Sequence, residues 1–200
     1  MRLIVNGEER SFNPESYENF GQLLSEIEKE NEGKVLSRLV INGKEIPLSQ
    51  IDRLRDARID EGVESIEMEF EPLRKFLVKT LEEVVKYVEN VIKLLPKVSE
   101  DMVVDSSKGY RSVKDLTEGL SAVESLRENT MKISGITPGD VGISDREGEV
   151  AQILKDFVDN LERRDIIELS DLIERELPKV LEYYRDYFSK VLEILKERES

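Results

Sequence analysis

The chain has 200 residues, enough for one large domain or two small ones, and 38% of them are hydrophobic and 37% charged. The formal net charge is −14, and both residues 1–72 and the remainder are acidic, so neither nucleic acid nor an anionic membrane surface is expected as a partner. The sequence has no Cys and no His, which excludes disulfides, thiol nucleophiles, Ser-His-Asp chemistry and the usual zinc sites.

An internal repeat opens the chain. Residues 2–9 read RLIVNGEE, and residues 38–45 read RLVINGKE. Each copy is an apolar run followed by Asn-Gly, which favours the type I′ turn of a tight hairpin, so each predicts two antiparallel strands. An internal duplication and two unrelated hairpins with the same turn chemistry both fit the pattern, and either gives four strands.

A helix and a fifth strand complete this part of the chain. Between the hairpins, four apolar residues fall on one helical face: Phe20, Leu23, Leu24 and Ile27. Residues 51–59 are short and irregular. Ile66, Met68 and Phe70 then alternate with glutamates, which predicts a strand with one buried face.

The order of these elements resembles the ubiquitin-like β-grasp fold across residues 1–71, and residues 38–46 are similar to the third and fourth strands of ubiquitin, including the Gly-Lys turn. The resemblance implies a β-grasp domain, residues 1–72, that binds proteins through its sheet face or edge. Ubiquitin-type modifiers end in a free Gly-Gly tail, whereas here the last strand runs through Glu71 and Pro72 into more protein. Conjugation and sulfur transfer are therefore not implied.

From Leu73 onward the apolar period changes from two to about 3.5 residues. One stripe is Leu77, Leu81, Val84, Val88, Val91, Leu95 and Val98, and another is Ile173, Leu177, Val180, Tyr184, Tyr187, Val191 and Ile194. Both stripes are wider than one neighbouring helix covers, which favours a bundle over a two-stranded coil. Two further helices are expected across 113–126 and from Ser144, where Glu147 would complete a capping box. The fold class is therefore α+β, with an antiparallel four-helix bundle over residues 73–200.

Both long helices contain Leu-Pro-Lys-Val, at residues 95–98 and 177–180. Because the apolar phase continues through each proline, we expect a kinked helix at both places. A duplicated helical hairpin and a chance match both explain the shared letters. Residues 165–178 also loosely resemble the closing helix of uncharacterised bacterial helical-bundle proteins, a likeness that implies no activity.

Two features could carry chemistry in the helical part. The glycine-bearing connector 135–144 could cradle a phosphate, but it lacks the P-loop ending and does not follow a strand, so a mobile connector is the simpler interpretation. The acidic pairs Asp165 with Glu168 and Asp171 with Glu174 could hold Mg²⁺ on a helical face, but acidic pairs are common in so acidic a chain and mostly decorate a solvated surface. No catalytic, cofactor or metal residue is assigned.

An aromatic cluster gives the candidate protein-contact residues Tyr183, Tyr187 and Phe188. Tyr184 and Tyr187 lie on the apolar stripe and suit a core. Tyr183 lies off it and is the better contact candidate.

The sequence therefore favours a non-enzymatic protein-interaction protein, an adaptor or chaperone-like binder, whose partner is another protein or a second copy of itself. The alternative is a Mg²⁺-carboxylate enzyme or small-ligand binder with its site between bundle helices. No signal peptide and no apolar run of the roughly 18 residues that a membrane span needs is visible, so the cytoplasm is expected. Abundant Glu, Lys and Arg suggest a thermophile.

Overall fold

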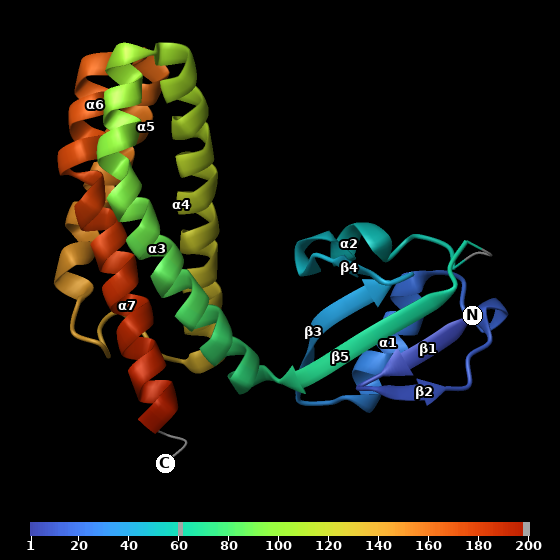
Figure 1. The fold of residues 1–200 in the computed structure, drawn as a ribbon. Helices are drawn as coiled ribbons and strands as arrows, with labels where there is room; N and C mark the ends of the chain where they lie inside the picture. Colours follow the sequence, from blue (N-terminus) through green and yellow to red (C-terminus); the bar gives the residue numbers. More distant parts are fainter. Residues whose placement is uncertain (60–61, 198–200) are drawn as a thin grey trace. The chain divides into compact units, whose positions relative to one another are not determined.

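The computed structural model describes residues 1–59 and 62–197. The chain divides into two compact units, Met1–Leu77 and Val78–Ser200, here named the sheet unit and the helical unit. The fold class is α+β, as predicted: a five-stranded mixed sheet is followed by long helices (Figure 1).

The sheet has the strand order β2-β1-β5-β3-β4. Its strands are β1 (Arg2–Val5), β2 (Glu8–Arg10), β3 (Lys34–Ile41), β4 (Lys44–Ile46) and β5 (Ser65–Pro72). Strand β1 pairs with β5 in parallel, and the other pairs are antiparallel. This order, with two hairpins flanking the last strand, is the arrangement expected for a β-grasp.

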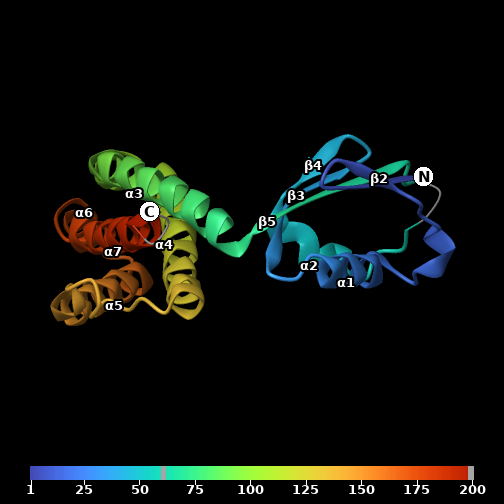
Figure 2. The same cartoon turned by 90° about the horizontal axis from the view of Figure 1, so that it is seen from below.

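Helix α1 (Phe20–Glu30) lies along one face of the sheet (Figure 2). The side chain of Asn19 caps this helix by accepting a hydrogen bond from the amide of Gln22 at 2.9 Å. The four apolar residues predicted to share a face are all buried against the sheet: Phe20, Leu23, Leu24 and Ile27. Short helical turns, η1 (Pro14–Ser16), η2 (Leu48–Gln50) and α2 (Ile51–Leu54), complete the unit.

The two Asn-Gly turns form as predicted, and the asparagine of each is hydrogen-bonded to β5. Asn6 and Asn42 adopt φ angles of 53° and 52°, in the left-handed region that this turn requires. The Asn6 side-chain oxygen accepts a hydrogen bond from the amide of Phe70 at 2.7 Å, and that of Asn42 accepts one from the amide of Ser65 at 3.1 Å. Each turn is thereby tied to a different end of β5.

In the described part of the chain, the helices from Leu73 onward are α3 (Leu73–Val104), α4 (Ser106–Ser134), α5 (Glu147–Arg163), α6 (Ile166–Arg175) and α7 (Leu177–Glu197). The two predicted stripes supply the core. Nine of their members are at most 2% exposed, among them Leu81, Val88, Tyr184 and Val191.

The two prolines act differently, and this changes the number of helices. Pro96 lies inside α3, which continues through it. At Pro178 the chain does not kink within one helix. Helix α6 ends at Arg175 and α7 starts at Leu177, which places Pro178 in the first turn of α7, where its missing N–H costs nothing. From Leu73 to Glu197 the structure therefore has five α-helices where four were expected.

The connector between α4 and α5 is packed onto α7. The Tyr187 hydroxyl donates to the carbonyl oxygen of Ile136 at 2.8 Å, and Lys190 Nζ donates to that of Val141 at 2.7 Å. The side chains of Ile136, Val141 and Ile143 are buried. The expected capping box is not formed, because Ser144 begins a short turn, η3 (Ser144–Arg146), and α5 starts only at Glu147. The connector is therefore a fixed part of the helical unit, in contrast to the mobile segment expected.

Candidate functional site

The structure places the predicted contact residues inside the helical unit. Tyr183 is 2% exposed, and Tyr187 and Phe188 are 0% exposed. Helix α7 contacts α4, α5 and α6, so neighbours cover its aromatic side chains on several sides. These three side chains are therefore buried in the helical unit and do not form a surface patch, although Tyr183, together with Tyr184, borders an opening.

That opening is a hollow of about 300 Å³ with a charged wall. The guanidinium of Arg127 donates two hydrogen bonds to Glu124, at 2.6 and 2.8 Å, and these raise the pKa of Arg127. The Tyr183 hydroxyl donates to Glu147 at 3.4 Å, and burial raises the pKa of Tyr183 to about 12. Because Glu124 already pairs with the Arg127 charge, the hollow offers no unpaired cation for an anionic ligand.

The acidic pairs considered for Mg²⁺ have structural partners. Asp165 accepts a hydrogen bond from the amide of Glu168 at 3.2 Å and so caps α6, and Asp171 forms an ion pair with Arg175 at 2.9 Å. Among residues 1–59 and 62–197, no three acidic side chains gather as metal ligands would. No observation favours the Mg²⁺ alternative.

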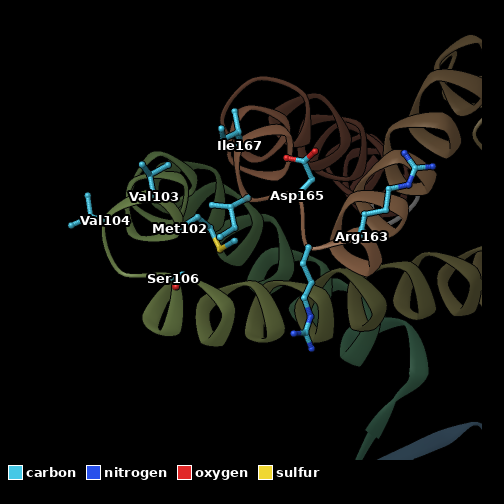
Figure 3. A pocket seen from close by; sticks show the side chains of 9 residues that line it. Met102, Val103, Val104, Ser106, Arg163, Asp165 and Ile167 are labelled. Atoms are coloured by element: carbon cyan, nitrogen blue, oxygen red, sulfur yellow. The ribbon is translucent and has the colours of Figure 1, made fainter.

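The most exposed large hydrophobic side chains in the described part of the helical unit lie at two of its helix junctions. Val103 and Val104, which end α3, are 66% and 78% exposed, and Ile167, in the first turn of α6, is 77% exposed. They border one open hollow of about 740 Å³ (Figure 3). We name this region the end surface, which comprises Met102, Val103, Val104, Ser106, Arg163, Arg164, Asp165, Ile166 and Ile167.

Two aspartates explain why the chain turns at this place. Asp105 caps α4 by accepting a hydrogen bond from the amide of Lys108 at 3.2 Å, and Asp165 caps α6 in the same way. Met102 is fully buried next to the junction of α3 and α4, and its burial fixes the end of α3. The two valines that follow it point away from the core. Capping and burial together thus hold the aliphatic side chains on the outside.

The end surface also has a cationic margin. In the described residues, neither Arg163 nor Arg164 has an ion-pair partner within 4.0 Å, whereas four other arginines of the helical unit each pair with a carboxylate. In Figure 3, Arg163 lies beyond Asp165 as seen from Val104. The surface therefore offers aliphatic groups on one side and a guanidinium on the other.

Sequence reasoning missed the end surface. A signal was present, because Val103 and Val104 interrupt the 3.5-residue phase just before the Asp105 cap, as Ile167 follows the Asp165 cap. Adjacent apolar residues beside a cap cannot all face the core. That these two places meet, however, follows only from the fold.

A second, smaller groove lies between α3 and α4. It has a volume of about 340 Å³ and includes Tyr87 and Leu94, which are 46% and 58% exposed. Its Lys97 pairs with Glu100 and Asp101, so the groove has no unpaired cation comparable to those of the end surface. Within the described residues, no helix is both long and apolar enough to cross a membrane.

Comparison with known families assigns each unit separately. The chain belongs to the family described as a domain of unknown function, DUF8042, whose model matches residues 79–195 and so covers more than half of the chain. The model of the TP0873 N-terminal domain matches residues 1–71. Searches of curated proteins and of solved structures gave no significant match.

Proposed function

We propose that this protein is a non-enzymatic protein-interaction protein, an adaptor or chaperone-like binder, whose end surface takes up part of another protein. The observation that carries the proposal is the exposure of Val103, Val104 and Ile167 around one hollow. Contiguous exposed aliphatic side chains on a highly charged protein are typical of interaction sites. Covering each of them contributes roughly 1–2 kcal/mol to binding before the cost of association.

The sheet unit would be a ubiquitin-like β-grasp module with a second binding role. Its uncovered face is charged, with Arg38 paired to Glu69 at 2.9 Å and to Glu45 at 3.2 Å. The short strands β2 and β4 form its edges. Strand β5 leads directly into α3, so this module has no free tail there for conjugation and would act by binding alone.

The proposed setting is the cytoplasm of a thermophile, and it rests on composition. The chain is rich in Glu, Lys and Arg and contains no Cys. A Tm well above the mesophilic range of about 45–65 °C is the expected result. A Tm inside that range would remove the thermophile part and leave the binding proposal in place.

A capture experiment with two matched variants tests the function. The full chain, Ile167→Glu and Ile133→Glu are immobilised and incubated with lysate of the source organism, and the retained proteins are quantified by mass spectrometry. Ile133 is 47% exposed and lies in the last turn of α4, at the opposite end of that helix from Ser106. Both variants place the same charge on an exposed helix, so circular dichroism should show that both remain folded.

The expected result is a set of proteins retained by the full chain and by Ile133→Glu but lost from Ile167→Glu. Retention of the same proteins by both variants, or their equal loss from both, would show that the end surface is not the binding site.

A further inference from the structure

We propose that the segment bound at the end surface is acidic and amphipathic, with aliphatic side chains against Val103, Val104 and Ile167 and carboxylates toward Arg163 and Arg164. This inference rests on the proposed function of the same surface and adds the chemical class of the partner.

The first argument is local charge. The chain as a whole carries a formal charge of −14, so an acidic partner is repelled by most of its surface. At the end surface the residues that line the hollow include two arginines and one aspartate. The carboxylate of that aspartate, Asp165, is engaged as the cap of α6. The two guanidinium groups are left without an ion-pair partner in residues 1–59 and 62–197, and carboxylates are their natural ligands.

The second argument is the placement of these groups. Arg163 ends α5, and Arg164 follows it at a φ of 56°, a left-handed conformation that usually favours glycine at this position. An arginine here bears a backbone cost that glycine would avoid, and it places a guanidinium at the margin of the hollow. Because Arg163 lies beyond Asp165 from Val104 (Figure 3), a segment that crosses the hollow meets aliphatic groups first and a cation afterwards.

The same charges disfavour a second copy of the chain as the occupant. A symmetric contact between two end surfaces would bring Arg163 and Arg164 of both copies to one interface. Against these two positive charges each copy's lining supplies the single negative charge of Asp165, whose carboxylate also accepts the capping hydrogen bond of α6, so two like-charged surfaces would meet. A different partner with aliphatic and acidic side chains would cover the aliphatic groups of the end surface and pair with its two arginines.

Two synthetic peptides test the inference with the full-length protein. They share leucines at helical spacing, and their remaining positions are Glu in one and Gln in the other. Binding is measured by fluorescence anisotropy of the labelled peptide at low and high salt. We expect the Glu peptide to bind more tightly than the Gln peptide in spite of the net charge of the protein, and to lose this preference at high salt.

Variants locate the binding. Arg163→Gln combined with Arg164→Gln should weaken the Glu peptide about fivefold, as expected for two exposed ion pairs, and leave the Gln peptide unchanged. Arg53→Gln combined with Arg58→Gln removes the same charge from exposed positions of the sheet unit and should change neither affinity. Ile167→Glu should weaken both peptides.

The outcomes separate this inference from the function on which it rests. Both peptides could bind with equal affinity, lose affinity for Ile167→Glu and keep the same affinity for the arginine double variant. In that case the end surface binds, but the acidic class of the partner is overturned. If Ile167→Glu weakens neither peptide, the end surface itself is overturned. If sedimentation shows a dimer that Ile167→Glu dissociates, a second copy is the occupant and the acidic partner is overturned.

Discussion

Ser99 on α3 and Ser170 on α6 place their hydroxyl oxygens 2.9 Å apart inside the helical unit. Ser170 Oγ also lies 3.1 Å from the carbonyl oxygen of Ser99, to which it donates, and Ser99 Oγ lies 3.2 Å from a carboxylate oxygen of Glu174. Both serines are buried. Polar groups in such a position need partners, and here two helices supply them to each other. The contact therefore fixes the position of α6 along α3.

The serine pair predicts a coupled loss of stability. Ser170→Ala leaves Ser99 without one of its partners, and we expect the free energy of unfolding to fall by about 1 kcal/mol, with a similar loss for Ser99→Ala. The double variant should lose less than the two single losses added together, because the second change removes a group that the first has already left unpaired. Urea denaturation measures all three, with the exposed Ser121→Ala as control. Simple additivity would show that the two hydroxyls act independently.

For Thr130, removal of the hydroxyl is expected to raise the stability of the protein. Thr130 is 0% exposed, and its hydroxyl has no hydrogen-bond partner among the described residues. Thr130→Val keeps the shape and removes the buried hydroxyl, so the free energy of unfolding should rise by about 1 kcal/mol. Thr117 is the matched control on the same helix, because its hydroxyl donates to the carbonyl oxygen of Val113 at 2.8 Å. Thr117→Val should be neutral or destabilising in the same thermal melts, and a loss of Tm in Thr130→Val would contradict the argument.

The parts of the fold that the sequence predicted are those set by short-range pattern. Asn-Gly specified both hairpins, alternation specified β5, and the 3.5-residue stripes specified α3 and α7. The break at Glu176 was missed because an apolar phase continues equally well through a kink and through a restart. The burial of Tyr183 was missed because the period of one helix does not show how many neighbours surround it, and α7 packs against α4, α5 and α6.

The end surface was out of reach for a related reason. Val104 and Ile167 are 63 positions apart, and each alone is an ordinary exposed residue. Only the fold brings the two junctions to one hollow. The unpaired state of Arg163 is likewise a property of three-dimensional distances, since the sequence around it is rich in acidic residues that could have paired with it.

The ion pairs of Asp186 predict a dependence of stability on pH. Burial alone would raise the pKa of this carboxyl, but hydrogen bonds from Arg185 and Arg146, both at 2.8 Å, outweigh it and lower the pKa. A carboxyl whose pKa is lowered by folding stabilises the protein above its unfolded pKa of about 3.9, and this contribution is lost as the pH falls through the folded value.

Asp186→Asn should therefore lower the free energy of unfolding at pH 7 by about 1–2 kcal/mol. The difference between the variant and the original chain should shrink below about pH 4, where the original carboxyl also becomes protonated. Urea titrations at several pH values measure this difference in the free energy of unfolding. The exposed Asp115→Asn serves as control, and a difference that stays constant down to acid pH would refute the ion-pair account.

Two helical glycines provide the last test, which links the packing of α3 and α4 to the end surface. A Cβ on Gly109 would lie 2.5 Å from the Cα atom of Met102, whereas a Cβ on Gly148 would meet nothing within 4 Å. Gly148→Ala should be neutral or stabilise α5 by up to about 1 kcal/mol, since alanine is the better helix former. Gly109→Ala must push the backbone of α3 away, and we expect the free energy of unfolding to fall by about 1–3 kcal/mol despite the same gain in helix propensity.

Because Met102 lines the end surface, Gly109→Ala should also weaken binding of the acidic peptide in the anisotropy assay, while Gly148→Ala should not. Equal stability of the two variants in urea would mean that the two helices can separate at this point without cost, and the close approach of Gly109 to Met102 would then not hold the end of α3 in place.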